Sequence, residues 1–252
     1  MRIEVRDLRF RRARFELAIP SLSIEPGRLT AVVGPNGAGK TTLLKCLAGL
    51  LPAHPGSIVL DGQDLAALSA AARARRLAFV PQEHASAFNY AVRDFILMGR
   101  APYLGLFASP AAEDEARAAE ALAFIGLPEY ADRPFFEMSS GERRLILIAR
   151  ALAQDTPALL LDEPTTFLDP RHESEVMHLL VRLVAERGKT VLVTLHNLDM
   201  AARFADILVV LKSGSIAACG PPGQVLNEEL LTRVYEIPMR ILAHEGRTFI
   251  VR

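Results

Sequence analysis

A glycine-rich octapeptide between a predicted strand and a predicted helix constrains the fold of this chain most. The segment GPNGAGKT, from Gly34 to Thr41, follows the apolar run LTAVV and precedes a helical pattern over residues 42–50. It matches G-x-x-x-x-G-K-[ST], in which backbone N–H groups wrap an anion and a helix N-terminus adds a favourable dipole. A glycine-rich turn that matched this motif by chance would not need to lie between a strand and a helix. The context therefore predicts a phosphate-binding loop in an α/β sheet.

The residues of this loop have individual expected roles. Its glycines allow the backbone to curl around an anion with the N–H groups pointing inward. Lys40 is expected to hold the β- and γ-phosphates of a nucleotide, and the Thr41 hydroxyl to bind Mg²⁺. The predicted phosphate-binding residues are Gly34, Pro35, Asn36, Gly37, Ala38, Gly39, Lys40, Thr41 and Thr42.

Five short apolar runs alternate with helical patterns along the chain. Continuous apolar strands separated by helices indicate a mostly parallel sheet that is covered on both faces. Near the N-terminus, RIEVRDLRF and SIVLDGQDL predict an antiparallel β edge. A further helical pattern covers residues 173–187. The five expected core strands are Leu29–Val33, Leu77–Val80, Ala158–Leu161, Thr190–Leu195 and Ile207–Leu211.

The pattern changes between residues 84 and 157, where strand signals are few. The stretches YAVRDFILMGR, AAEDEARAAEALAFIGL and ERRLILIARALA predict a helical lobe inserted into the sheet domain. After residue 220 we expect one short helix in QVLNEELLTRVYEI and a hairpin around His244–Arg247. We therefore expect a single domain over residues 1–252. Its parts are an α/β core with the β edge (1–83 and 158–220), the helical lobe (84–157) and a short C-terminal extension (221–252).

Composition narrows the class of protein. The 252 residues carry equal numbers of basic and acidic side chains and are 50% hydrophobic, which suits one large globular domain. A net charge of zero argues against broad nucleic-acid affinity. The two cysteines lie far apart, and Cys46 falls on the apolar side of its predicted helix, where we expect it in the core. No signal peptide or bilayer-spanning run is visible, so we expect a cytosolic protein that reaches a membrane only by docking.

Polar side chains follow the ends of the predicted core strands. Asp162 and Glu163 come directly after Ala158–Leu161, Gln82 follows the strand before them, and His196 the strand after. Each alone would be a solvated residue at a strand end. Because parallel neighbouring strands end at one edge of the sheet, we expect these groups and the phosphate loop to face one crevice. Asp162 suits the Mg²⁺ shell, through water, and Glu163 suits polarising a water molecule.

The stretch EMSSGERR predicts the start of a helix. Ser139 and Glu142 have the S-x-x-E spacing of a capping box, which satisfies backbone N–H groups at a helix N-terminus. The same free N–H groups and dipole also suit an anion. The same turn can therefore both cap the helix and bind an anion.

Taken in order, GPNGAGKT, Gln82, MSSGER, LLLDEP, the FLD that ends at Asp169, and His196 closely resemble the ATP-binding-cassette (ABC) ATPases. The resemblance covers essentially the whole chain. It implies a RecA-like core of the P-loop NTPase type, ATP hydrolysis with Mg²⁺, and two cassettes that sandwich two ATP molecules head to tail.

The resemblance assigns roles to the matching positions. Glu163, His196 and Gln82 would be catalytic, and Thr41, Gln82 and Asp162 would form the Mg²⁺ shell. Asp169 would lie in the loop that precedes the next helix, called the D-loop in this family. The signature turn of the family, which faces the ATP of the other subunit, would comprise Ser139, Ser140, Gly141 and Glu142.

Two features depart from the family pattern. The usual signature L-S-G-G-Q is replaced by Met138 for Leu, Ser140 for the first Gly and Glu142 for Gln. The aromatic residue that stacks on adenine in this family would fall near Arg11 or Arg12. Arg12 could stack through its guanidinium plane, or Phe10 or Phe15 could substitute, and the sequence leaves the choice open.

A separate cassette on a membrane permease is the member class that this sequence favours. The segment YAVRDFILMGRAPY and the tail VLNEELLTRVYEIPMRI resemble the ATPases of importers for iron–siderophore, haem and cobalamin. Importers of molybdate, tungstate, zinc or manganese are the nearest alternatives, followed by a separate-cassette exporter. A soluble phosphate-binding switch without a permease is the alternative from another class.

The resemblance also implies partners and a location. They are ATP, a second copy of the chain, integral-membrane permease subunits and, indirectly, a periplasmic or extracellular substrate-binding protein, with no nucleic acid. The expected location is the cytoplasmic face of the membrane, where the cassette is bound through the permease.

Overall fold

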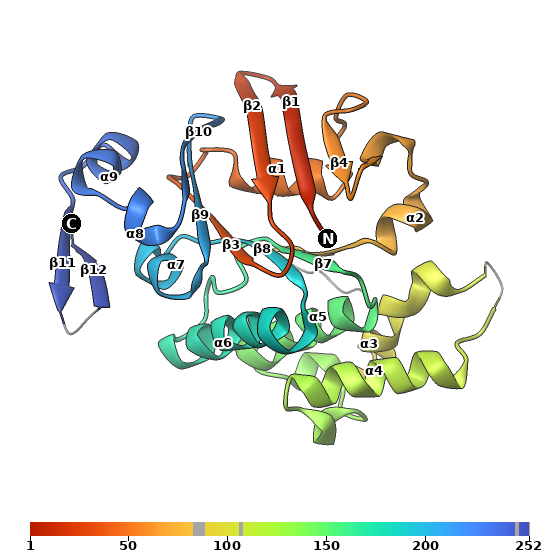
Figure 1. The fold of residues 1–252 in the computed structure, drawn as a ribbon. Coiled ribbons are helices and arrows are strands. Elements are labelled where there is room, and N and C mark those ends of the chain that lie inside the picture. Colours follow the sequence, from red (N-terminus) through yellow and green to blue (C-terminus); the bar gives the residue numbers. More distant parts are fainter. Residues whose placement is uncertain (83–88, 106–107, 245–246, 252) are drawn as a thin grey trace.

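A computed structural model describes residues 1–82, 89–105, 108–244 and 247–251. Its centre is a six-stranded sheet with the order β10-β9-β3-β8-β7-β6, visible across the middle of Figure 1. The five predicted core strands are confirmed, and all four pairings among them are parallel. The strands are β3 (Leu29–Val33), β6 (Leu77–Val80), β7 (Ala158–Leu161), β8 (Thr190–Thr194), β9 (Ile207–Lys212) and β10 (Ser215–Gly220).

An antiparallel sheet of order β2-β1-β4-β5 lies above the central sheet in Figure 1. It contains β1 (Ile3–Arg12), β2 (Phe15–Ile24), β4 (Ile58–Leu60) and β5 (Gln63–Asp64). The predicted antiparallel edge is confirmed, and SIVLDGQDL contributes two strands to it, β4 and β5. Asp61 and Gly62 both have positive φ, 45° and 84°, and Leu60 pairs with Gln63. This is a two-residue Asp-Gly hairpin, which reverses the chain between β4 and β5.

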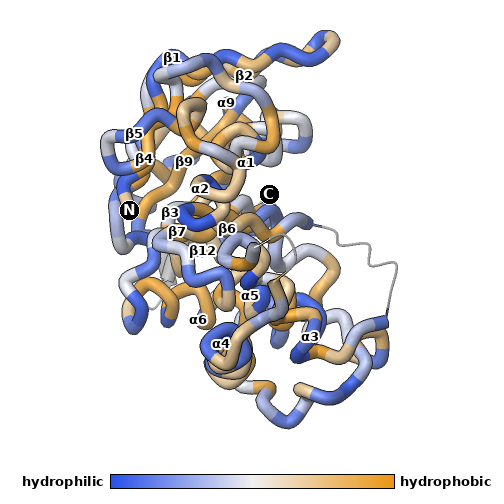
Figure 2. The backbone as a smooth tube through the Cα atoms, turned by 90° about the vertical axis from the view of Figure 1, so that its right-hand side faces the viewer, coloured by the Kyte–Doolittle hydropathy of each residue, from blue (hydrophilic) through white to orange (hydrophobic). Residues whose placement is uncertain are grey.

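Both faces of the central sheet are covered, so its strands are buried on both sides. In β3, Val32 packs into the core beneath the antiparallel sheet and α1 (Lys40–Leu47). Its neighbours Ala31 and Val33 pack into the core on the other face. Cys46 of α1 lies in the first core, as expected, where burial raises the pKa of its thiol to about 11. Figure 2 shows the apolar, orange segments running through the middle of the molecule.

Helices below the sheet form the second layer. The lobe helices α3 (Val92–Leu97), α4 (Ala112–Phe124) and α5 (Ser140–Ala153) share one continuous core with the sheet strands and with α6 (Pro170–Arg187) and α7 (Leu198–Phe204). The first predicted lobe helix is shorter than expected, because it passes into the 3₁₀ helix η2 (Met98–Tyr103), which contains Pro102. The short helices are η1 (Leu65–Ala67), α2 (Ala70–Ala74), η3 (Pro128–Tyr130) and η4 (Phe135–Glu137).

The C-terminal extension contains two helices rather than the one predicted. These are α8 (Pro222–Val225) and α9 (Glu228–Tyr235). Asn227 separates them because its side chain caps the start of α9, accepting a hydrogen bond from the Leu230 N–H at 2.8 Å. The predicted hairpin is confirmed as β11 (Arg240–His244) and β12 (Arg247–Val251), with its turn outside the described residues. Among the helices that the structure describes, none combines the length and hydropathy of a membrane span.

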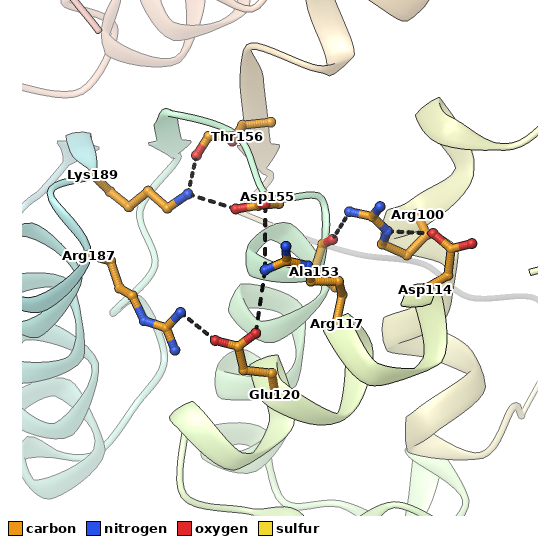
Figure 3. Close-up of polar contacts among 9 residues, drawn as sticks. All are labelled: Arg100, Asp114, Arg117, Glu120, Ala153, Asp155, Thr156, Arg187 and Lys189. Atoms are coloured by element: carbon orange, nitrogen blue, oxygen red, sulfur yellow. Dashed lines mark hydrogen bonds and ion pairs between the residues drawn. The ribbon is translucent and has the colours of Figure 1, made fainter. Parts of the chain in front are cut away.

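Polar contacts hold the helical lobe together and join it to the sheet layer (Figure 3). Arg100 of η2 and Asp114 of α4 form a buried ion pair at 2.8 Å. Arg100 also donates to the carbonyl of Ala153 at the end of α5, at 3.0 Å. One side chain therefore ties three helical segments of the lobe.

A more exposed charge cluster joins α4 to the core. Glu120 on α4 pairs with Arg187 at the end of α6 at 2.5 Å, and Lys189 pairs with Asp155 at 3.1 Å. Arg117 lies between them, 3.6 Å from Glu120 and 3.9 Å from Asp155. Because these groups are solvated, each pair contributes little, whereas the buried Arg100 contact is the stronger tie.

We expect the Arg100–Asp114 pair to make stability depend on pH. The hydrogen bond from Arg100 lowers the pKa of the Asp114 carboxyl below its usual value of 3.8. The group therefore stabilises the fold above that usual value, and its contribution is lost as the pH falls through the lower pKa of the folded state. Asp114→Asn should lower the melting temperature at neutral pH, and the gap from the parent should close below about pH 4.

Calorimetric scans of both proteins between acid and neutral pH make the measurement. Asp132→Asn is the matched control, because Asp132 pairs with Arg93 while its side chain is 78% exposed. That change should leave the melting temperature nearly unchanged. If Asp114→Asn lowered the melting temperature equally in acid and at neutral pH, the Arg100–Asp114 pair would not be the source of the pH dependence.

Candidate nucleotide-binding site

The predicted phosphate loop joins β3 to α1 as the sequence required. Gly34 has a φ of 152°, and an added Cβ would lie 2.2 Å from the carbonyl oxygen of Leu211. Gly39 has a φ of 105° at the N-cap of α1, where a Cβ would lie 2.8 Å from the Phe15 ring. Backbone conformation and close packing therefore both require glycine here. With no side chain at the N-cap, the first turn of α1 presents its N–H groups to the crevice.

Lys40 is a buried ammonium that the loop itself holds. Its side chain is 5% exposed, and Nζ donates to the carbonyls of Gly34 at 2.9 Å and Pro35 at 3.3 Å. Burial lowers its pKa, and the nearby carboxylates of Glu163 and Asp162 partly oppose that shift. The ammonium is therefore preorganised beside the loop, with carbonyl contacts that phosphate oxygens can replace.

Asp162 is anchored by two hydroxyl groups at the end of β7. It is 2% exposed, and its Oδ1 accepts hydrogen bonds from Thr41 Oγ1 at 3.0 Å and Thr194 Oγ1 at 2.9 Å. The link to Thr41 brings the carboxylate to the phosphate loop. A carboxylate and a hydroxyl side by side are hard oxygen ligands of the kind that Mg²⁺ accepts.

Glu163 is held by side chains from the ends of two neighbouring strands. Its Oε1 lies 2.6 Å from His196 Nε2, and its Oε2 accepts from Gln82 Nε2 at 2.8 Å and Thr166 Oγ1 at 3.3 Å. The Glu163 N–H donates to Thr194 Oγ1 at 2.8 Å. The residue has a φ of 48°, a conformation that costs about 1–3 kcal/mol and turns the chain sharply after β7. Strain of this kind is typical of a functional position.

The predicted strand-end groups therefore meet. An open crevice of about 570 Å³ contains all of them except Asp162, which lies beneath Thr41. Its size suits a ligand as large as a nucleotide. The crevice is lined by Phe15, Asn36, Gly37, Gly39, Lys40, Thr41, Thr42, Gln82, Glu163 and His196.

The structure distinguishes among the candidates for adenine stacking. Phe15, at the start of β2, lies in the crevice lining. Phe10 is partly buried in the core, where it pairs with Leu17 across the β1–β2 ladder. Arg11 and Arg12 are exposed, and Arg11 forms an ion pair with Glu16 at 2.8 Å. Among these candidates Phe15 alone lines the crevice.

The signature turn has the predicted capping box. Ser139 Oγ accepts from the Glu142 N–H at 3.3 Å, and Glu142 Oε2 accepts from the Ser139 N–H at 2.7 Å. This second contact lowers the pKa of Glu142, and the Tyr130 hydroxyl supports the same carboxylate. Met138 is buried in the core, and Ser140 is exposed. In the part of the chain that the structure describes, the turn does not line the crevice of its own subunit.

The predicted D-loop residue Asp169 caps α6. Its Oδ1 accepts from the N–H groups of Arg171 and His172, each at 3.0 Å. Its Oδ2 lies 2.7 Å from His172 Nδ1. The carboxylate is therefore fully engaged within its own helix N-terminus.

Comparison with known proteins identifies the family of this chain. A sequence profile of the family described as ABC transporter matches residues 17–166, more than half of the 252-residue chain. The chain is also 45% identical to the hemin import ATP-binding protein HmuV of Rhodococcus jostii over 89% of this chain and 76% of that protein. The chain belongs to the ABC transporter family. It is accordingly an ABC-type ATPase whose activity is coupled to transport.

Solved structures of other family members support the fold. An inward-facing ABC transporter of metal-chelate type superposes with a TM-score of 0.86 at 32% identity, over 98% of this cassette and 95% of that chain. A dimeric bacterial ABC transporter cassette gives a TM-score of 0.73 at 27% identity, over 87% and 98% of the two chains. The predicted α/β cassette fold with an antiparallel subdomain and a helical insert is confirmed.

The contacts of three residues in this ABC cassette were not predicted from the sequence. Arg144 of α5 is 8% exposed and donates to the carbonyls of Pro81 at 3.1 Å and Gln82 at 2.7 Å, which ties α5 to the end of β6. Thr194 anchors both acidic residues, and a polar residue at the carboxyl end of a largely apolar strand could have signalled it. The third is His172. Like His54, His178, His84 and His244, it has no metal-ligand spacing in the sequence, a pattern that favours a surface position. His54 and His178 are exposed, whereas residue 84 and the side chain of residue 244 lie outside the described residues.

Thr194 should stabilise the cassette through its two buried contacts. Thr194→Val leaves the Glu163 N–H and the Asp162 carboxylate each without one partner, so the free energy of unfolding should fall by about 1–3 kcal/mol. ATPase activity should fall as well, because both acidic side chains lose an anchor. Denaturant unfolding and steady-state ATPase assays measure the two effects.

Thr30→Val is the matched control on the neighbouring strand β3. Thr30 is 1% exposed, and its hydroxyl has no hydrogen-bond partner among the described residues. Removing that hydroxyl should be neutral or stabilising. Equal destabilisation by the two substitutions would show that the Thr194 contacts have no special importance.

Proposed function

We propose that this ABC cassette hydrolyses ATP to power the import of a metal chelate through a separate membrane permease. The observation that carries the hydrolytic part is the Glu163 carboxylate, held between His196 and Gln82 and 4.0 Å from the Lys40 ammonium. A carboxylate placed beside a phosphate loop suits activation of water, because it is fixed before the substrate arrives.

Each side chain then has one task in hydrolysis. The loop N–H groups and Lys40 hold the β- and γ-phosphates, and Lys40 exchanges its carbonyl contacts for phosphate oxygens. Glu163 orients the attacking water, and His196 and Gln82 fix the direction of its carboxylate. Lys40 and Glu163 are 5% and 6% exposed, so little water competes with the attraction between their charges.

The donor groups present fit Mg²⁺. The Thr41 hydroxyl and the Gln82 amide carbonyl would hold it directly, and Asp162 would hold it through water. Among the described residues no group of three or more His, Cys, Asp or Glu side chains is placed to hold a metal. Mg²⁺ is held by few protein ligands together with waters and substrate phosphates. When bound, it would neutralise charge on the phosphate oxygens.

Phe15 is our proposed adenine platform. Its ring lies against Gly39 of the phosphate loop and lines the same crevice. Stacking of a base on an aromatic side chain contributes about 1–3 kcal/mol, so this contact would favour adenosine over free phosphate.

Two cassettes would close head to tail around two ATP molecules. The signature turn opens the 14-residue helix α5 with an exposed Ser139, and the free N–H groups of its first turn can face the γ-phosphate in the partner. Asp169 would lie at the same interface. The likeness to a dimeric cassette supports this arrangement.

The transport part of the proposal rests on the comparisons and on one surface. The cargo class, iron–siderophore, haem or cobalamin, is supported by the likeness to HmuV and to the metal-chelate transporter, and by relatives named for cobalamin import and iron(3+)-hydroxamate import. Exposed Tyr90, Met98 and Tyr103 lie on the segment that follows Gln82, where we place the permease contact. The cassette would then sit at the cytoplasmic face of the membrane, and a periplasmic or extracellular binding protein would act only through the permease. Importers of molybdate, tungstate, zinc or manganese and a separate-cassette exporter are the alternatives.

Different parts of the chain would have different functions. Residues 1–83 and 158–220 would bind and hydrolyse ATP, and residues 84–157 would carry the signature turn and the permease contact. Residues 221–252 would form a short extension.

Two substitutions distinguish the residue that binds ATP from the residue that catalyses its hydrolysis. Lys40→Ala should weaken both ATP affinity and turnover, because it removes a direct phosphate contact. Glu163→Gln keeps the shape of the side chain but loses the carboxylate, so ATPase activity should fall by roughly 10²–10⁴-fold while ATP binding persists. An ATP-dependent dimer of Glu163→Gln should accumulate in sedimentation experiments.

Near-parent ATPase activity in Glu163→Gln would refute the catalytic assignment. A pull-down with the tagged cassette from detergent-solubilised membranes tests the transport part separately, because it would retain a permease that binds the cassette. A cassette that hydrolyses ATP but binds no permease would favour a soluble phosphate-binding switch.

A further inference from the structure

The side chain of His172 lies between the D-loop and the signature turn of the same subunit. Its Nδ1 is 2.7 Å from Asp169 Oδ2. On its other side the ring packs directly on Gly141. A Cβ built on Gly141 would lie 2.3 Å from His172 Cδ2, 2.6 Å from Cγ and 2.8 Å from Nε2. One imidazole therefore contacts the start of α6 and the start of α5.

The hydrogen bond fixes the orientation of the ring. The Asp169 carboxylate can only accept, and contacts from His172 lower its pKa. His172 Nδ1 must therefore carry the proton and donate it to this carboxylate. Because the same carboxylate also accepts the His172 N–H, the residue is held at two points, and the Cδ2–Nε2 side of the ring is left against Gly141.

The contact explains why position 141 is glycine. The φ of Gly141 is not in the left-handed region, so its backbone conformation does not demand glycine. What excludes a side chain is the His172 ring, which fills the space of a Cβ. By contrast, Ser140, one residue earlier, is exposed and has room for its side chain.

We infer that His172 is a positioning residue that locks the signature turn to Asp169, so that Ser139 and the Gly141 N–H meet the γ-phosphate in the partner subunit at a fixed place. The inference rests on the proposed function, in which the signature turn contacts that phosphate. His172 itself touches no nucleotide. It acts by holding the first turns of two interface helices as one unit.

The first experiment measures nucleotide-dependent dimerisation. Starting from Glu163→Gln, which should trap the dimer, we add His172→Ala or His172→Asn and follow sedimentation with MgATP. The asparagine amide can keep the hydrogen bond to Asp169 but leaves the space against Gly141 empty. Both variants should weaken the dimer by about tenfold, the size of coupling expected between neighbouring residues. ATP affinity of the monomer should stay at the parent value, because the subunit's own phosphate loop is untouched.

The matched control is His178→Ala on the same helix. His178 is exposed, bonds within α6 to the Ser174 carbonyl and contacts Phe204. This control should dimerise like Glu163→Gln alone. His172 variants that also dimerise like the parent would overturn the inference and leave the proposed function standing. Failure of Glu163→Gln itself to dimerise with intact ATP binding would instead count against the proposed sandwich.

A second experiment tests the contact without nucleotide or partner. Gly141→Ala should lower the melting temperature of the nucleotide-free protein, because its Cβ collides with the His172 ring. In a His172→Ala background the collision is absent, so Gly141→Ala should cost little or be neutral. Melting-temperature losses that simply add in the double variant would show that the ring does not govern position 141, and the inference would fall.

Discussion

The buried carboxylate of Glu163 is the contact on which the rest of the site depends. It accepts hydrogen bonds from the ends of β6 and β8 and lies next to the ammonium of the phosphate loop. Parallel pairing of β3, β8, β7 and β6 as immediate neighbours brings those groups to one edge of the sheet. The two buried cores above and below the sheet hold that strand order, and the left-handed turn at Glu163 aims the carboxylate into the crevice.

The helical lobe is tied to this centre at several points. Arg144 bonds the end of β6, His172 packs on the signature turn, and the contacts around Arg100 hold the lobe helices together. A buried guanidinium that bonds backbone carbonyls is costly to displace, because its donors would lose their partners. The position of Ser139 is thus linked through short contacts to Gln82 and to Asp169. In the proposed mechanism, a change at the γ-phosphate would reach the lobe through these packed groups.

Much of the fold could be predicted from local pattern, because buried parallel strands are continuous apolar runs and the phosphate loop has a specific spacing. The capping box at Ser139 could be predicted for the same reason, because Ser139 and Glu142 lie close together in the sequence. Other features depend on contacts between distant segments, and these could not be predicted. β2 and β10 are half-exposed strands without a distinctive run, and Phe15 reaches the crevice only because β1 and β2 pair in one register. His172 looked like a surface residue because Gly141, which it covers, is far away in sequence.

In the proposed mechanism, the start of α5 both caps its own helix and binds a phosphate in the partner subunit. Ser139→Asp tests it most directly, because aspartate caps a helix as well as serine does, while its charge would face a triphosphate. The measurement is the ATPase rate at saturating MgATP, taken together with melting temperature and ATP affinity of the same variant. Our account predicts a stable protein that binds ATP normally but has lost turnover. A stable Ser139→Asp protein with the parent rate would show that the turn is a helix cap and nothing more.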